Sequence, residues 1–416
     1  MKRLFGILAM AMLIATLLVP VAAASAEGYD LVFWVYSDWM AGKQNELLVK
    51  WIDEFVASHD QVNSITMIGK NDTELKTGAM AGVGLPDIYC GSFRDGLTYY
   101  ESVNLLDLMP YYEKTDDQYK NGWMPEAIDI VQVDGGMWAL PYMSYIPIIF
   151  RNLDVIEACG IDPSEPLKTW DEFIDQCKRI TEAGYSATHK WSGVYYTAGA
   201  IMAAEPTLTP GFENGATTIT PEQLIPTFEV IKALSPYTTT LSYSDEATKQ
   251  AFYTNKIAFV LDGPWNVEGY DNSGVNYDIL AVPGFTEDGK NGGLRGWDAI
   301  YGVDSGDKAR NEMIAEFMLY ITNTENQSEW VSYNGRPVLR QDAMDSEGAQ
   351  ATEIGRVSAE AQKGGANQMD FFHSTVFWPT TIADISELVA GGSMEPADAA
   401  NAMVDAINAM YIDAGE

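Results

Sequence analysis

Short apolar strands alternate with amphipathic helices over residues 31–90, and this alternation constrains the fold more than any other feature of the chain. Apolar runs rich in β-forming residues predict strands at Leu31–Tyr36, Ser64–Ile68 and Pro86–Cys90. Helices are predicted between them, the second over Glu74–Ala81. The apolar face of the first comprises Leu47, Leu48, Trp51, Ile52 and Phe55. Strands and helices in this order predict a parallel sheet with helices on its faces, an α/β fold.

A chain of 416 residues is too long for one core, so two lobes are expected. Leu140–Phe150 is extended and broken by two prolines, which suits a crossing between lobes. Flexible Gly292–Arg295 marks a second crossing. We therefore predict that 27–144 and 299–345 form the first lobe, and 145–298 and 346–416 form the second.

The second lobe is also predicted to be α/β. Thr169 and Glu172, and then Thr220 and Gln223, have the spacing of capping boxes that open helices. Strands are expected at Ile257–Leu261 and Tyr277–Val282, and further helices carry apolar faces near 310–321 and 403–410.

The segment Lys256–Val267 places a tryptophan where a buried strand ends. Its strand stops at Gly263-Pro264, and Trp265 follows where a helix begins. In open α/β sheets, ligands bind at the carboxyl ends of strands. A flat indole there suits a sugar ring, and a tryptophan buried in the core is the alternative.

The net charge of −34 argues against binding nucleic acid or anionic membrane surfaces. Residues 1–26 have the pattern of a cleaved signal peptide, with Lys2 and Arg3 before an apolar run and an Ala24-Ser25-Ala26 cleavage site. An uncleaved membrane anchor is the alternative. Export to the periplasm or cell surface is expected.

Recognisable motifs for covalent or metal catalysis are missing from the sequence, so we predict no enzyme activity, cofactor or metal site. The three histidines lack metal-ligand spacing. Paired carboxylates for glycoside cleavage stay open because acidic residues are plentiful. The three cysteines do not form a disulfide scaffold, although Cys159 and Cys177 could meet if their helices pack together.

Aromatic residues gather near predicted strand ends and in loops. Those at strand ends are Trp34, Trp39, Tyr142, Tyr145, Trp265 and Trp297; those in loops are Trp191, Tyr195, Tyr196 and Trp378. Polar residues beside the same turns are Asp38, Asp87, Asp298 and Arg336. Such rings can stack on sugar C–H faces while the polar groups bind hydroxyls. Burial in a core is the alternative for each ring.

Several short motifs in this order and spacing resemble the extracellular sugar-binding proteins of ABC importers, of the maltose-binding-protein type. They are Leu85-Pro86-Asp87-Ile88, Ala139-Leu140-Pro141-Tyr142, Phe150-Arg151-Asn152, Cys159–Pro163, Thr169–Phe173, Lys256–Phe259 with Gly263-Pro264-Trp265, Gly335-Arg336-Pro337-Val338 and Phe377-Trp378. The resemblance implies a periplasmic-binding-protein-like fold, in which two α/β lobes joined by several crossing segments surround a central cleft. A sugar would bind in this cleft, and the closed lobes would dock on a membrane permease.

The same resemblance implies particular contacts. The turn Ser37, Asp38 and Trp39, together with Asp87, would supply polar contacts from the first lobe. Tyr142, Trp265 and Trp378 would stack from the second, and Trp297 and Asp298 would lie at the second crossing. Arg336 is the one cation of the predicted site and is expected in a salt bridge, which favours neutral ligands over phosphorylated ones.

Three other functions stay open. Asp38, Asp87 and Asp298 could surround a cationic solute such as a polyamine or a peptide, with cation–π contacts to the aromatic rings. The chain could instead be a secreted carbohydrate-active enzyme, or a surface adhesin without a transport partner. The main prediction is a receptor that acts as a monomer and passes a neutral sugar to ABC permease subunits.

Overall fold

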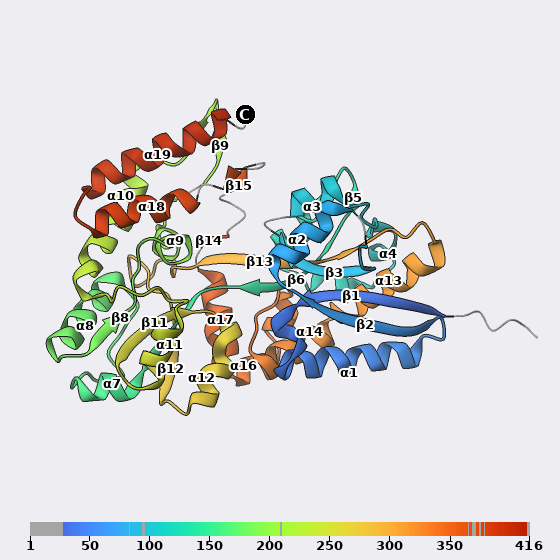
Figure 1. Ribbon diagram of the computed structural model, residues 1–416, viewed down its shortest axis with the longest axis horizontal. Coiled ribbons are helices and arrows are strands. Elements are labelled where there is room, and N and C mark those ends of the chain that lie inside the picture. The colour runs from blue at the N-terminus through green and yellow to red at the C-terminus, as the bar shows by residue number, and fades with distance from the viewer. Residues whose placement is uncertain are drawn as a thin grey trace, which may run out of the picture.

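The computed structural model consists of two lobes that lie side by side (Figure 1). It describes residues 28–413 except 83, 94, 95, 209, 365, 368–371, 374, 375 and 378. The predicted signal peptide and Trp378 therefore lie outside the described residues. In the part of the chain that is described, no helix has both the length and the apolar character needed to cross a membrane.

A mixed sheet forms the centre of the first lobe. Its strands are β1 (Tyr29–Tyr36), β2 (Val62–Lys70), β3 (Ile88–Ser92), β6 (Leu140–Tyr145), β13 (Leu294–Gly302) and β14 (Ala366–Asn367). Strand β1 pairs in parallel with both β2 and β3. Strand β13 runs antiparallel to β3 and to β6. The parallel pairing predicted for the first three strands is confirmed.

Helices cover this sheet. They are η1 (Ser37–Met40), α1 (Gly42–Ser58), α2 (Asp72–Ala81), α3 (Gly96–Ser102), α4 (Met109–Tyr112), α5 (Asp117–Asn121), α6 (Pro125–Asp129), α13 (Lys308–Ile321), α14 (Thr324–Asn334), α15 (Gln341–Met344) and α16 (Glu347–Ala351), with a small hairpin of β4 (Gln132–Val133) and β5 (Gly136–Met137). The five apolar residues predicted to face inward from α1 are all buried.

The second lobe has a four-stranded sheet in the order β12-β7-β11-β8. These strands are β7 (Ile148–Asn152), β8 (Ser186–Thr188), β11 (Ile257–Asp262) and β12 (Tyr277–Ala281). Strand β7 runs antiparallel to β11 and β12, whereas β11 and β8 are parallel. The strand predicted before Trp265 is therefore β11, which is buried along its whole length.

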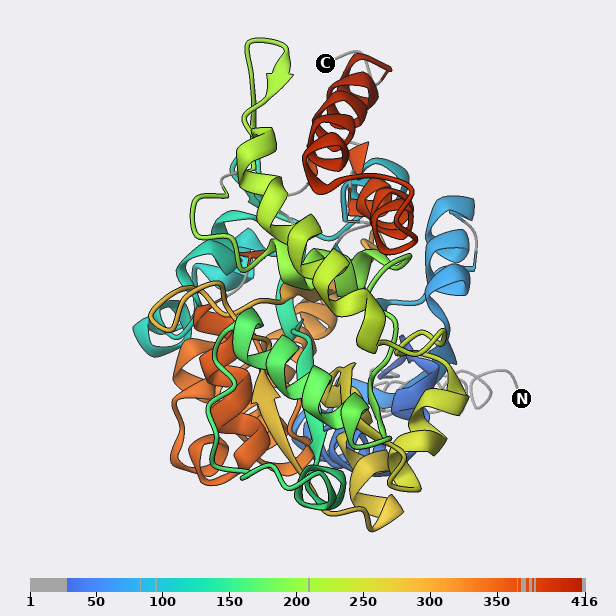
Figure 2. The same ribbon diagram turned by 90° about the vertical axis from the view of Figure 1, so that its left-hand side faces the viewer.

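Helices of the second lobe surround this sheet (Figure 2). They are α7 (Leu153–Ala158), α8 (Trp170–Glu182), α9 (Tyr195–Met202), α10 (Pro221–Leu234), η3 (Ser235–Tyr237), α11 (Glu246–Tyr253), η4 (Pro264–Asn266), α12 (Val267–Ser273), α17 (Glu353–Lys363), α18 (Pro379–Ala390) and α19 (Pro396–Asp413), with the short strands β9 (Phe212–Glu213), β10 (Ala216–Thr217), β15 (Phe372–His373) and β16 (Val376–Phe377). A capping box at Thr169 and Glu172 opens α8, as predicted.

The buried hydrophobic side chains form separate clusters in the two lobes. The change of cluster along β13 falls between Leu294, in the second lobe, and Trp297, in the first. Helix α17 contributes Ile354 to one lobe and Ala359 to the other. The division into two cores agrees with two lobes, but the predicted boundaries stay a prediction, because Trp297, Ala349 and Ala359 lie in the first lobe's cluster although they were predicted in the second lobe.

One local prediction needs correction. Gly292–Arg295 was expected to be a flexible linker, but β13 begins at Leu294 and runs without a break to Gly302. Pairing with β6 explains why this segment is a regular strand, because its backbone N–H and C=O groups gain ladder hydrogen bonds. The three cysteines are free, so Cys159 and Cys177 do not pair.

Candidate functional site

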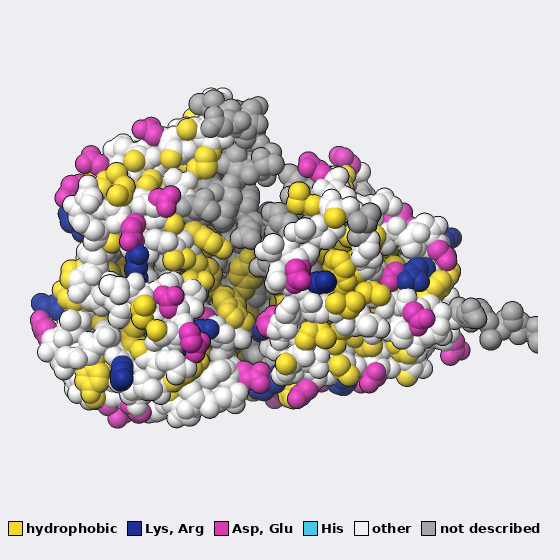
Figure 3. Space-filling view, viewed as in Figure 1, with side chains coloured by type: hydrophobic (Ala, Val, Ile, Leu, Met, Phe, Trp, Pro, Cys, Tyr) yellow, Lys and Arg dark blue, Asp and Glu magenta, His cyan; other side chains and the backbone are white. Residues whose placement is uncertain are grey.

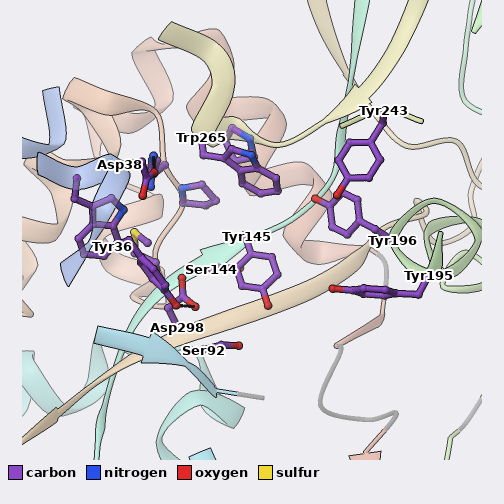
Figure 4. A pocket seen from close by; sticks show the side chains of 15 residues that line it. Tyr36, Asp38, Ser92, Ser144, Tyr145, Tyr195, Tyr196, Tyr243, Trp265 and Asp298 are labelled. Atoms are coloured by element: carbon purple, nitrogen blue, oxygen red, sulfur yellow. Dashed lines mark hydrogen bonds and ion pairs between the residues drawn. The ribbon is translucent and has the colours of Figure 1, made fainter. Parts of the chain in front are cut away.

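A cavity of about 290 Å³ lies between the two lobes. Its lining comprises Tyr36, Asp38, Trp39, Ser92, Met143, Ser144, Tyr145, Tyr195, Tyr196, Tyr243, Pro264, Trp265, Asp298, Arg336 and Pro337. Figure 3 shows apolar side chains in the hollow between the lobes, and Figure 4 shows the lining side chains around one space. Side chains from both lobes and from the crossing strands therefore face the same cavity.

The first lobe contributes two polar pairs. Arg336 Nη2 donates to Asp38 Oδ2 at 2.7 Å, and the Arg336 side chain is buried while Asp38 is exposed. The Tyr36 hydroxyl, at the end of β1, donates to Asp298 Oδ1 on β13 at 3.0 Å. Each pair joins residues far apart in sequence: Tyr36 and Asp298 lie on strands of the sheet, whereas Asp38 lies in η1 and Arg336 follows helix α14. The salt bridge predicted for Arg336 is present.

Four buried polar groups in the lining have no hydrogen-bond partner among the described residues. They are Trp39 Nε1, the Ser144 hydroxyl, the Tyr196 hydroxyl and Arg336 Nε. Buried polar groups are almost always paired, and an unpaired one costs free energy. A ligand that supplies hydroxyl groups would satisfy them.

The second lobe contributes an aromatic wall. The Trp265 ring lies 6.1 Å from the Tyr196 ring, which lies 5.2 Å from the Tyr243 ring. Tyr145, on the crossing strand β6, meets Trp265 edge-on with centroids 6.2 Å apart. Figure 4 shows these rings on one side of the cavity and Asp38 and Asp298 on the other.

Two glycines make room for these rings. A methyl group on Gly263 would lie 2.1 Å from atoms of the Trp265 ring, and one on Gly296 would lie 1.9 Å from the Tyr145 ring. Both distances are far below van der Waals contact. Each ring therefore lies directly over a glycine, in the space that a side chain would otherwise occupy.

The charged groups of the lining are two carboxylates and one guanidinium, so the cavity has no surplus of positive charge. Burial raises the pKa of Tyr243 to about 12, and burial also raises the pKa of Tyr196 well above its usual range. Both phenols are therefore neutral hydrogen-bonding groups at physiological pH. Among the described residues, no three His, Cys, Asp or Glu side chains are grouped so that they could hold a metal ion.

Eight of the residues predicted from the sequence line this cavity. They are Asp38, Trp39, Tyr145, Tyr195, Tyr196, Trp265, Asp298 and Arg336. Trp39 contributes only an edge, because its ring is buried against Trp330 and Tyr142. Tyr195 and Tyr196 lie on helix α9 rather than in the expected loop.

Asp87 lies elsewhere. Arg310 of α13 donates to both of its carboxylate oxygens, at 2.7 and 2.8 Å, and the backbone N–H of Val32 donates to it as well. Asp87 precedes β3, so it stands at the amino end of that strand, away from the cavity. We therefore leave Asp87 out of the proposed site.

Three predicted aromatic residues belong to the hydrophobic cores. Tyr142 and Trp297 are buried in the first lobe, although the resemblance implied that Tyr142 would stack from the second. Trp191 is buried in the second lobe and donates to Thr188 Oγ1 at 3.0 Å. The alternative of core burial therefore applies to these three rings.

Two further predicted residues do not line the cavity. Trp34 packs under Lys70, whose Nζ lies 5.0 Å from the ring. Ser37 is exposed at the start of η1. For Trp378 the prediction lies outside the described residues.

Sequence reasoning missed several lining residues. Tyr36 and Ser92 are the last residues of β1 and β3, so the strand-end rule applied strictly would have selected them. Ser144 sits in the extended crossing segment, and Tyr243 lies before α11 with no local signal.

Two α/β lobes, joined by crossing strands and lined at their interface by side chains from both, define a two-lobed solute receptor. A family model described as bacterial extracellular solute-binding protein matches residues 50–355. The chain belongs to this family, whose members bind substrates outside the cell.

Two relatives and two solved structures illustrate the likeness. The sn-glycerol-3-phosphate-binding periplasmic protein UgpB of Agrobacterium fabrum is 23% identical over 58% of this chain and 53% of its own. A maltotriose-binding protein of Pyrococcus abyssi is 25% identical over 61% of this chain and 54% of its own. The match thus spans about half the length of these relatives.

The structure of a cyclic α-maltosyl-1,6-maltose binding protein from Arthrobacter globiformis superposes with a TM-score of 0.76 at 16% identity, covering 93% of this chain and 100% of that one. The GacH receptor of Streptomyces glaucescens gives 0.74 at 18% identity, covering 93% and 99%. At these identities the superpositions show the fold, and the predicted two-lobed α/β fold is confirmed.

Proposed function

We propose that this protein captures a neutral carbohydrate in the interlobe cavity and delivers it to an ABC permease. One observation carries the proposal: four buried polar groups without a partner among the described residues belong to the lining of a cavity that also has an aromatic wall. A sugar matches both walls, because it has apolar C–H faces and a rim of hydroxyl groups. The unpaired groups at Ser144, Tyr196 and Arg336 would gain partners from those hydroxyls.

Lobe closure follows from where the contacts originate. Trp265 and Tyr196 belong to the second lobe, whereas Asp38, Arg336 and Tyr36 belong to the first. A ligand that touches both walls binds the closed form better than the open form and shifts the population toward closure. The closed form would then be the one that a permease recognises.

The charge of the site favours a neutral ligand. The one guanidinium of the lining is already paired with Asp38, and Asp298 adds a second carboxylate. A phosphate ester would bring negative charge to these carboxylates. The name of the Agrobacterium relative specifies a glycerol phosphate and that of the Pyrococcus relative specifies maltotriose. The cavity described here suits the second kind of ligand.

Trp265→Ala tests the proposal. We expect at least about a tenfold loss of affinity in titration calorimetry, because the stacking ring is lost while the fold remains. Mass spectrometry of material retained through purification would identify the sugar to titrate. Tyr111→Ala on α4 is the matched control, since Tyr111 lies outside the cavity. If the Trp265 variant bound the sugar as tightly as the wild type, Trp265 would not be a ligand-binding residue.

The other functions have distinct readouts. A cationic ligand would raise the melting temperature in a thermal-shift screen of polyamines and peptides, by mass action. Release of reducing ends from oligosaccharides by the purified protein would instead identify an enzyme. Either result would contradict the neutral-sugar proposal.

A further inference from the structure

The carboxylate of Asp262 is buried at the end of β11, with the residue only 1% exposed. Oδ1 accepts from the backbone N–H of Gly263 at 2.8 Å and from Asn266 Nδ2 at 2.7 Å. Oδ2 accepts from the Tyr270 hydroxyl at 3.1 Å. The first two donors lie on either side of Pro264 and Trp265. One carboxylate therefore closes the turn that carries the aromatic wall's tryptophan.

This carboxylate has no compensating cation in contact. Among the described residues, no Lys, Arg or His nitrogen lies within 4.0 Å of it. Burial raises its pKa, and the three hydrogen bonds together with the charge of Lys249 oppose that rise. An ionised carboxylate without a cation is costly to bury, so the three hydrogen bonds to Asp262 must offset part of that cost.

The same side chain links the turn to the core. The Tyr270 ring stacks on Phe150 of β7, with centroids 3.8 Å apart and planes within 10°. At the other end, the Trp265 ring folds back over Gly263, the residue that donates to Asp262. The indole's position is therefore set by the backbone of this turn, and the turn is tied through Asp262 to the sheet.

We propose that Asp262 is a positioning residue, which fixes the Trp265 ring for ligand stacking without touching the ligand. The expected effect on sugar affinity rests on the proposed function. The orientation of the Trp265 ring does not, because it is a property of the ligand-free protein. Asn266 and Tyr270 are the two side chains through which Asp262 acts.

Fluorine NMR of protein labelled with 5-fluorotryptophan tests the proposal directly. The Trp265 resonance is assigned from Trp265→Phe, and spectra are recorded without ligand. Asp262→Leu removes all three acceptor contacts, so the resonance should move or broaden and sugar affinity should fall at least about tenfold. Asp262→Asn keeps one acceptor oxygen for Gly263 and Asn266 and offers an amide to Tyr270, so it should restore both readouts.

Asp278→Leu is the matched control. Asp278 lies on β12 in the same lobe and pairs with the buried Arg151, so its loss also affects stability. It should lower the melting temperature while leaving the Trp265 resonance unchanged. If loss of stability alone displaced the Trp265 ring, the Trp265 resonance would move in Asp278→Leu as it does in Asp262→Leu. That result would overturn the proposal.

Two further outcomes keep the test decisive. If Asp262→Leu does not fold, Asn266→Ala removes a single donor, and an unchanged Trp265 resonance in that variant would overturn the proposal. If the wild-type protein binds no sugar, the proposed function fails, but the ligand-free spectra still decide the role of Asp262. An Asp262→Leu resonance identical to wild type overturns the inference in either case.

Discussion

Glu268 of the second lobe lies against Gly42, the first residue of helix α1 in the first lobe. A methyl group on Gly42 would lie 2.8 Å from the Glu268 Oε2 atom. Helix α1 is 17 residues long, and its N-cap residue, Ala41, provides no side-chain hydrogen bond. A carboxylate near a helix N-terminus is stabilising, because the unpaired N–H groups carry partial positive charge. This contact can form only while the two lobes are together.

Glu268→Gln should therefore favour the open arrangement. A charge at a helix N-terminus is worth about 0.3–1 kcal/mol, so ligand affinity should fall about two- to fivefold. Small-angle scattering should show a larger radius of gyration without ligand. Glu229→Gln on α10, outside the interlobe cavity, is the control. Equal affinities for the two variants would show that Glu268 does not contribute to closure.

Asp38→Asn should change which ligands the protein prefers. The substitution leaves the buried Arg336 guanidinium without its only carboxylate partner among the described residues. The affinity for a sugar phosphate, relative to the same sugar without phosphate, should rise on the order of tenfold. Titration of both ligands measures this ratio, with Asp345→Asn as a control on the surface of the first lobe. A ratio that does not move would contradict the electrostatic argument.

Gly296→Ala should displace an aromatic ring without removing it. Gly296 pairs with Tyr145 across the crossing strands, and the Tyr145 ring occupies the space where a methyl group would be. The ring must swing away, which also removes its edge contact with Trp265. We expect an affinity loss of roughly tenfold, measured by calorimetry. Gly348→Ala, where a methyl group would meet only the Ser332 side chain, should have no such effect.

The buried His189 side chain should make the folded protein less stable in acid. Burial lowers its pKa from 6.5 to about 4, and its Nε2 accepts the backbone N–H of Leu261 at 2.9 Å. Between these pH values the unfolded chain takes up a proton that the folded protein does not, so stability falls as pH falls through this window. The full difference amounts to roughly 3 kcal/mol. Urea unfolding from pH 7 to pH 4 should show a steeper decline for wild type than for His189→Gln.

Local patterns predicted most of the elements because helices and strands depend on neighbours in sequence. The inward face of α1 follows from its helical spacing, and the turn before Trp265 follows from Gly263-Pro264. Trp265 was placed correctly at a strand end because the residues that fix its position lie within a few positions of it.

The site was harder to predict because its pairings join distant residues. Asp87 meets Arg310, which follows 223 positions later, so no local pattern shows that its charge is already compensated. Trp297 and Tyr142 were predicted at strand ends like Trp265, but each lies inside a strand, β13 or β6, and belongs to the core. Tyr243 precedes α11 and lines the cavity with its ring beside that of Tyr196, which is 47 positions earlier in the chain.

Strand β13 makes each lobe depend on a part of the chain that is synthesised late. It pairs with β3 in the first lobe's sheet, although more than 200 residues separate the two strands. A fragment that ends before Leu294 would leave the edge of β3 open, and open strand edges recruit other chains. Attempts to produce the amino-terminal half alone should therefore yield aggregates, whereas a permuted chain that joins both segments of the first lobe should remain monomeric.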